Sequence, residues 1–167
     1  MINFAVNQWD KNKQKLEENI LNNLKDYEDC DYRYLVAKVV EFIFNDENSE
    51  FTGDEYDCEK ITEINNGGYQ GTLLYIIPEK SYQPSEYQYL MTYVNYGSCS
   101  GCDTLKALQR QVEDIFDEYS DYTPEAETEK TAQAVKDIMS LCLHLVQNTI
   151  KPYNKGWAFD ENFEEVK

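Results

Sequence analysis

Residues 60–77 read KITEINNGGYQGTLLYII and contain the features that decide the fold. Asn and Gly tolerate the positive φ angles of tight turns, so residues 65–68 (NNGG) predict the turn of a β-hairpin. Residues 73–77 form a continuous apolar run, which is typical of a strand that is buried on both faces. Residues 86–96 (EYQYLMTYVNY) then predict a third strand that ends at a Gly- and Ser-containing corner.

Helical periodicity flanks this sheet on both sides. Residues 10–28 predict one amphipathic helix, and Asp29 or Asp31 is positioned to cap a second helix that reaches Ile43, although its β-branched content also fits a strand. A third helix is expected to begin near residue 102. A fourth begins at Thr123 and Pro124, a favourable helix start, and runs to about Ile150. The third helix carries an apolar stripe formed by Leu105, Leu108, Val112, Ile115, Phe116 and Tyr119.

The predicted fold class is therefore α+β, with a small antiparallel sheet of about three strands flanked by N-terminal and C-terminal helices. A length of 167 residues fits one domain. Within residues 1–167 we expect a helical part (1–45), a sheet part (59–96), a second helical part (102–151) and an acidic tail (152–167).

The charge of the chain restricts its partners. With 32 acidic and 15 basic residues, the formal net charge is −17, and no basic patch is present. Such a chain is repelled by nucleic acid and by anionic membranes, and it attracts basic proteins. No apolar run approaches the roughly 20 residues that span a bilayer, and five cysteines without a signal segment indicate reduced thiols. We therefore expect a cytoplasmic protein with a basic, nucleic-acid-binding protein as its partner.

Two segments concentrate the acidic residues. Both are candidate partner-binding surfaces, and both are also explained as solvated faces. If residues 111–129 were one helix of about 28 Å, they would carry a carboxylate per roughly 3.6 Å. One DNA strand offers a charge per about 3.4 Å, so the segment is a candidate DNA mimic. The candidate residues are Glu113, Asp114, Asp117, Glu118, Asp121, Glu125, Glu127 and Glu129 in the first segment, and Asp54, Glu55 and Asp57 in the second.

Cys99 and Cys102 form a Cys-x-x-Cys pair between the third strand and the helix that follows it. Unpaired N–H groups at a helix N-terminus stabilise a thiolate, so this pair is a candidate for thiol redox chemistry. It also supplies half of a tetrahedral zinc site, although no second such pair completes it. The further zinc ligands to consider are Cys30, Cys58, Cys142 and His144, so zinc remains an alternative and no metal is assigned. The third interpretation is that the two thiols pack beneath a tight corner.

Two other features leave their interpretation open. Tyr87, Tyr89, Met91 and Tyr93 share one face of the third strand, which suits either a binding surface or a sheet face covered by helices. His144 is the only histidine, and it lies in an apolar stretch that suggests a core or boundary position. No phosphate-binding loop, zinc-protease motif or calcium loop is present, so we expect a protein that is not an enzyme.

The strings YGSCSGCDTL (96–105), YQGT (69–72) and YQPS (82–85) resemble an uncharacterised family that is found in phages and prophages of Gram-positive bacteria. The resemblance covers residues 65–108, and it implies no catalytic residue because the family has no established activity. Small acidic phage proteins are often inhibitors of host defence. The resemblance thus implies an anti-CRISPR or anti-restriction role, with a phage structural or assembly role as a further alternative.

Overall fold

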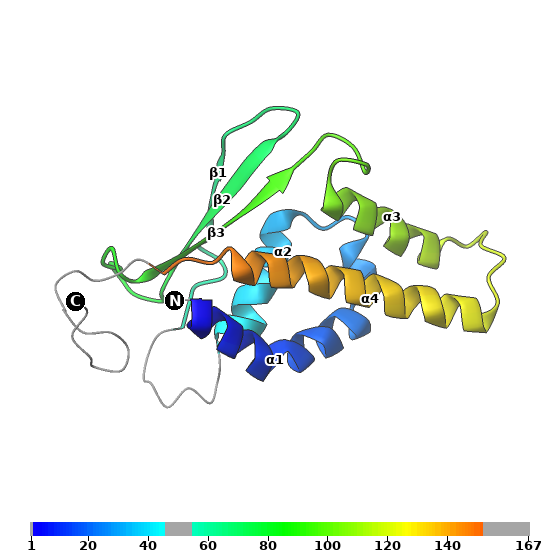
Figure 1. Cartoon of the computed structure of the whole chain (residues 1–167), viewed down its shortest axis with the longest axis horizontal. Helices are drawn as coiled ribbons and strands as arrows, with labels where there is room; N and C mark the ends of the chain where they lie inside the picture. The colour runs from blue at the N-terminus through cyan, green and yellow to red at the C-terminus, as the bar shows by residue number, and fades with distance from the viewer. Residues whose placement is uncertain (1, 46–54, 152–167) are drawn as a thin grey trace.

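The computed structural model describes residues 2–45 and 55–151 of the 167-residue chain. The chain is an α+β protein in which an antiparallel sheet lies between N-terminal and C-terminal helices, as the sequence predicts (Figure 1). Asp54 and the acidic tail, which are both parts of the sequence prediction, lie outside the described residues.

The described part of the chain has one three-stranded sheet in the order β1-β2-β3, formed by Thr62–Asn65, Gly71–Pro78 and Tyr89–Tyr96. The predicted hairpin is confirmed, because Asn65 is paired with Leu73 across the 66–70 loop. The side-chain oxygen of Asn66 accepts a hydrogen bond from the Thr72 N–H at 2.8 Å, which holds this loop. The third strand begins at Tyr89, three residues later than predicted, because the preceding residues form a turn.

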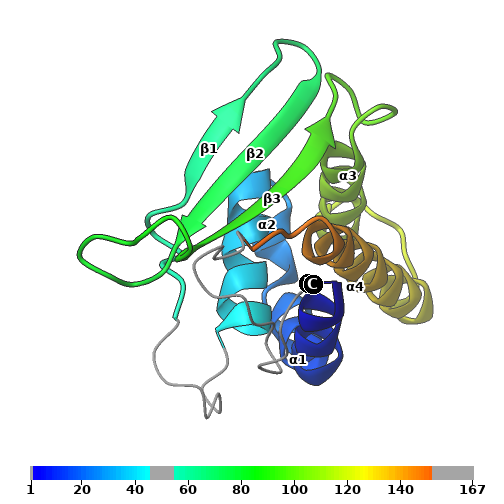
Figure 2. The ribbon, with the colours of Figure 1, turned by 60° about the vertical axis from the view of Figure 1, so that its left-hand side comes forward.

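The two faces of the sheet differ in their surroundings. Side chains alternate across a strand, and the buried face carries Leu73, Tyr75, Ile77, Leu90 and Val94 within the hydrophobic core. Helices cover this face, as two views of the ribbon show (Figures 1 and 2). The opposite face carries Tyr93, which is 40% exposed. The tyrosine-rich face of β3 is therefore the outer face, and the prediction that helices cover it is wrong.

The N-terminal helices differ from the predicted ones in their bounds. Helix α1 spans Ile2–Asn22, and the 3-10 helix η1 follows at Leu24–Tyr27. The predicted helix over 10–28 is interrupted at Asn23, whose backbone N–H and side-chain amide both donate to the Asn19 carbonyl, at 3.1 Å and 2.8 Å.

The β-branched segment after Asp31 is helical, so its alternative interpretation as a strand is wrong. Helix α2 spans Tyr32–Val39, and a π-helical turn, η2, continues it over Val40–Phe44. Asp31 caps α2 by accepting a hydrogen bond from the Tyr34 N–H at 2.8 Å, which confirms one of the two predicted caps.

The C-terminal helices pack against each other as a hairpin. Helix α3 spans Thr104–Phe116 and helix α4 spans Pro124–Gln147. Thr123 caps α4, as predicted, by accepting from the Ala126 N–H at 3.3 Å. The loop that joins the two helices lies at the end of the molecule farthest from the sheet (Figure 1). After α4, Ile150 pairs with Met91 on β3 and ties the end of the described chain to the sheet edge.

None of the helices in the described ranges combines the length and the apolar character that a membrane span requires.

Candidate functional site

The acids of residues 111–129 gather at one end of the molecule, which we call the α3–α4 tip. The tip comprises residues 113–129: the last turn of α3, the loop over 117–123 and the first turns of α4. All eight candidate carboxylates are exposed there: Glu113, Asp114, Asp117, Glu118, Asp121, Glu125, Glu127 and Glu129. Among the described residues, none of these carboxylates lies within 4.0 Å of a basic nitrogen, in contrast to other acids of the chain.

The single helix that would space these charges like a DNA strand is absent. Helix α3 ends at Phe116 and α4 begins at Pro124, so the acids lie on two packed helices and their connection. Asp117 adopts extended backbone angles, and its side chain accepts from the Tyr119 N–H at 2.9 Å. This Asp turn redirects the chain before Pro124, so the acids form a compact cluster instead of a 28 Å row.

Helix dipoles act in opposite senses on four of the eight acids. Glu125 and Glu127 lie in the first turn of α4, where the positive end of the dipole stabilises a carboxylate. Glu113 and Asp114 lie in the last turn of α3, which holds no basic residue and where the negative end of the dipole disfavours a carboxylate. Local helix stability therefore explains the first group and not the second.

Exposed aromatic rings accompany the acids at the tip. Phe116 is 41% exposed, Tyr119 is 90% exposed and Tyr122 is 39% exposed. The sequence predicted Phe116 and Tyr119 on the apolar stripe of α3. Phe116 is the last residue of that helix, whereas the prediction is wrong for Tyr119, because α3 ends before it. A hollow of about 740 Å³ lies beside these rings, and it is lined by Glu28, Arg110, Glu113, Asp114, Phe116, Asp117, Glu118 and Tyr119.

Two of the tip rings lie beneath lysines of the chain itself. The Lys130 ammonium lies 3.8 Å from the centroid of the Tyr122 ring, and the Lys25 ammonium lies 5.8 Å from that of Phe116. Cations are attracted to the faces of aromatic rings within about 6 Å. The tip therefore combines the two chemical features, carboxylates and ring faces, that bind lysine and arginine side chains.

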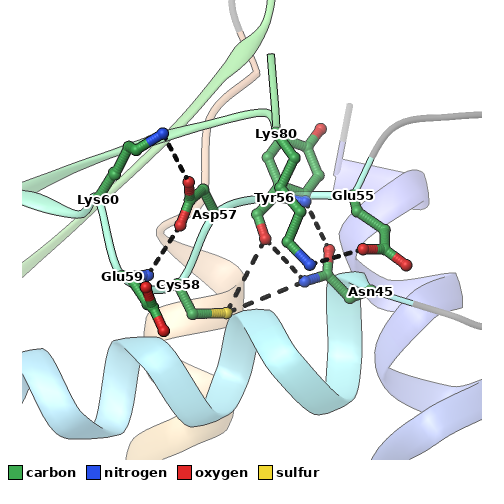
Figure 3. Close-up of polar contacts among 8 residues, drawn as sticks. All are labelled: Asn45, Glu55, Tyr56, Asp57, Cys58, Glu59, Lys60 and Lys80. Carbon is green, nitrogen blue, oxygen red and sulfur yellow. Dashed lines mark hydrogen bonds and ion pairs between the residues drawn. The ribbon is translucent and has the colours of Figure 1, made fainter. Parts of the chain in front are cut away.

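The second acidic segment has a different arrangement (Figure 3). Glu55 forms an ion pair with Lys80 at 2.7 Å, and Asp57 forms one with Lys60 at 3.3 Å. Asp57 also accepts from the Glu59 N–H at 3.0 Å. These two candidate binding residues hold local structure, and lysines of the chain itself already offset their charge.

Cys99 and Cys102 lie at the other end of α3, on the corner that connects β3 to this helix. Both side chains are exposed, and their sulfur atoms are 2.8 Å apart. The Cys99 N–H donates to the Cys102 sulfur at 3.1 Å, and the Cys102 N–H donates to the Cys99 carbonyl at 3.0 Å. The hydrogen bond from the Cys99 thiol, followed by that from the backbone, lowers the pKa of the Cys102 thiol. The prediction that these thiols pack beneath the corner is wrong.

Asp103 holds this corner in place from below. Its buried carboxylate accepts from the Tyr32 hydroxyl at 2.8 Å, from the Gly97 N–H at 2.9 Å and from the Leu105 N–H at 2.9 Å. Burial and the bond to Asp103 raise the pKa of Tyr32. A Cβ atom on Gly97 would lie 2.4 Å from the Cys102 carbonyl oxygen, so only glycine fits at this position.

The remaining metal-ligand candidates do not join the Cys99–Cys102 pair. Cys30 and Cys142 are buried, and burial raises the pKa of each thiol to about 12. Cys58 bonds to the Tyr56 carbonyl, and His144 is exposed and bonded to Asn148 at 3.2 Å. Within residues 2–45 and 55–151, no group of three His, Cys, Asp or Glu side chains is placed to hold a metal ion.

A cleft of about 560 Å³ opens beside the cysteine corner, between the 66–70 loop and the start of α2. Gly97, Ser98 and Asp103 contribute to its wall, and Tyr32, Tyr75 and Tyr96 contribute ring atoms or hydroxyls. The Tyr75 hydroxyl donates to Glu63 at 2.9 Å and the Tyr96 hydroxyl donates to Asn65 at 2.8 Å. The polar groups named here are therefore bonded to one another within the protein.

Comparisons of the chain with known protein families, with curated proteins and with solved structures gave no match. The resemblance to a phage and prophage family therefore stays a prediction.

Proposed function

We propose that this chain is a non-enzymatic binding protein that blocks a basic, nucleic-acid-facing surface of another protein. The observation that carries this proposal is the α3–α4 tip, where eight exposed carboxylates lack an ion pair among the described residues. The partner is a nucleic-acid-binding protein of a bacterial host or of its defence systems, in line with the phage resemblance. The protein would act in the bacterial cytoplasm and would not bind nucleic acid or membranes itself.

The acids at the end of α3 support a binding role because they reduce the stability of the helix that carries them. Glu113 and Asp114 oppose the dipole of α3, and like charges nearby repel them further. A sequence selected only for stability or solubility would place lysine or arginine in this turn. Their placement is accounted for if a cationic partner surface supplies the missing counter-charge.

The exposed aromatic rings can form the buried centre of an interface, which carboxylates alone do not form. Tyrosine and phenylalanine are enriched in the buried centres of protein interfaces, whereas carboxylates steer the encounter and set specificity. Phe116 lies between the carboxylates of α3 and those of the loop, and Tyr119 lies among the loop acids, between Glu118 and Asp121 in the sequence. We therefore expect the rings to be buried by the partner and the acids around them to pair with its lysines and arginines.

The test compares two variants of equal charge. The tip variant carries Glu113→Lys, Asp114→Lys, Glu118→Lys and Asp121→Lys, and it keeps Asp117, whose side chain bonds to the Tyr119 N–H. The control variant reverses four exposed acids away from the tip: Glu17, Glu18, Glu59 and Glu86.

Each tagged protein is incubated with bacterial lysate supplemented with purified CRISPR and restriction effectors, washed at low and at high salt, and analysed by mass spectrometry. We expect the natural chain and the control variant to recover the same basic nucleic-acid enzyme, with loss at high salt and competition by DNA. The tip variant should bind at least about a hundredfold more weakly. Equal recovery by the tip variant would contradict the proposal. Recovery of the chain's own copies alone would favour an assembly role instead.

A further inference from the structure

The sulfur atoms of the two thiols at the N-terminal end of α3 lie close to one another in the reduced chain. They are 2.8 Å apart, whereas a disulfide needs about 2.05 Å. Both cysteines are exposed, so a small molecule can reach either sulfur.

The corner that carries the thiols is fixed by contacts that do not involve them. Asp103 binds the Gly97 N–H below the turn, and the Lys106 ammonium donates to the Ser98 carbonyl at 3.0 Å above it. The turn closes through the Cys102 N–H and the Cys99 carbonyl. The pair is therefore held together in its reduced form, which removes most of the entropic cost of forming the bond.

The two sulfurs differ in their surroundings. The Cys102 sulfur accepts the Cys99 N–H at 3.1 Å, and the Cys99 thiol also lies against it, so its thiolate is the better stabilised of the two. The Cys99 sulfur lies against it as the second thiol. This asymmetry assigns Cys102 as the attacking thiol and Cys99 as the resolving thiol.

We propose that Cys99 and Cys102 are a thiol–disulfide exchange site whose substrates are disulfides of low molecular weight. The Cys102 thiolate attacks one sulfur of RSSR, which forms the Cys102–S–SR bond and releases one RS⁻. The Cys99 thiol loses its proton to solvent and attacks the Cys102 sulfur, which forms the Cys99–Cys102 bond and releases the second RS⁻. Two protein thiols are oxidised and one disulfide is reduced to two thiols, so atoms and electrons balance.

A metal site fits these residues less well. Two sulfurs bound to one zinc ion at about 2.3 Å each lie near 3.8 Å from one another, farther apart than this pair. No third ligand from His, Cys, Asp or Glu joins them in the described part of the chain. The exchange site is also independent of the acidic tip, which lies at the opposite end of α3, so either proposal can fail alone.

The experiment treats the reduced full chain with oxidised glutathione, quenches with acid, alkylates under denaturing conditions and locates each modification by peptide mass spectrometry. We expect Cys99 and Cys102 to lose alkylation together and to be linked within one chain, while Cys30, Cys58 and Cys142 remain alkylatable. Reduced glutathione in excess should restore both thiols.

Three variants assign the roles of the two thiols. C99S should accumulate the glutathione mixed disulfide on Cys102, because the resolving thiol is missing. C102S should form no intramolecular disulfide and should react more slowly than C99S at neutral pH. C58S, in which a half-buried thiol outside the corner is removed, should behave like the natural chain. A natural chain that stops at a stable glutathione adduct, or that leaves both thiols unmodified, would overturn the proposal.

Discussion

At its N-terminal end helix α3 starts from a corner in which Asp103 is bonded to three elements of the fold, whereas at its C-terminal end it carries carboxylates that bond to none of them. Asp103 is buried and joins the residue after β3, helix α2 and helix α3 through Gly97, Tyr32 and Leu105. Glu113 and Asp114 are exposed and oppose the helix dipole. One helix thus has an end that stabilises the fold and an end whose carboxylates form no ion pair among the described residues.

The two ends of α3 show that acidic residues have different roles at different places in this chain of net charge −17. A carboxylate that accepts several hydrogen bonds in the interior is part of the fold. A carboxylate that lacks such partners, and that lies where the local field is unfavourable, does not stabilise its helix, and the proposed function assigns it to contact with another molecule. The expected effects of mutation on stability differ accordingly.

The largest effect on stability is expected at the N-terminal end of α3. Asp103→Ala removes a helix cap and leaves the buried Tyr32 hydroxyl and Gly97 N–H without their acceptor, so the free energy of unfolding should fall by about 2–4 kcal/mol. Asp103→Asn keeps one acceptor oxygen and should lose about half as much. Urea unfolding followed by circular dichroism measures both. A loss below about 0.5 kcal/mol for the alanine variant would remove the difference between the two ends of α3.

A second effect near the same end of α3 depends on pH. The Gln109 amide of α3 donates to the Cys30 carbonyl at 2.7 Å, and burial, followed by the charges of Asp31 and Asp29, raises the pKa of the Cys30 thiol to about 12. The unfolded chain releases this proton near the ordinary value of 9.0, so the stabilisation is complete below pH 9.0 and is lost as the pH rises toward 12.

The slope of the free energy of unfolding against pH measures the contribution of the Cys30 thiol separately from that of packing. Between about pH 10 and pH 11 the free energy of unfolding should fall by about 1.4 kcal/mol per pH unit from Cys30, in addition to the contributions of other buried groups. Cys30→Ala keeps the carbonyl that Gln109 binds and should make the slope shallower by that amount. An unchanged slope would mean that this thiol is already accessible to solvent in the folded chain.

The sheet and the caps were predictable from the sequence because local chemistry determines them. The Asn-Gly turn fixes the hairpin, and Asp31 and Thr123 occupy the helix caps that their side chains favour, whereas the alternation along β3 did not decide which of its faces the helices cover. The exposure of the acids followed from their charge.

The chemistry of the tip could not be predicted in the same way. Tyr119 continues the helical spacing of the apolar stripe that includes Phe116, so the sequence placed it on α3. The helix ends first, because the side chain of Asp117 binds the Tyr119 N–H and Ser120 closes a turn on the Asp117 carbonyl. The Asp-x-x-Ser pattern was the available signal. Whether an acid forms an ion pair with a lysine depends on how elements that are distant in the sequence pack against each other. This packing cannot be inferred from one sequence.

A smaller effect, of opposite sign, is expected at the C-terminal end of α3. The tip variant places lysines where the dipole favours cations and reduces like-charge repulsion, so it should raise the free energy of unfolding by about 0.5–1 kcal/mol at low salt. Added salt should reduce the gain because the charges are exposed. The control variant has the same change in net charge. If its free energy of unfolding rose equally, the effect would come from total charge and not from the position of the lysines.

The smallest effect is expected at the second acidic segment, where lysines of the chain already pair with the acids. Lys80 and Glu55 are 2.7 Å apart and both are more than half exposed, so solvent screens their attraction. A double-mutant cycle with Lys80→Gln and Glu55→Gln should give a coupling that is favourable at low salt, weaker than any effect above and absent at high salt. In the partner pull-down, Glu55→Gln should bind like the natural chain, because Lys80 already offsets this charge. A large loss of binding would instead mean that the partner surface extends from the α3–α4 tip to residues 55–60. The position of that surface could then no longer be inferred from which acids lack an ion pair.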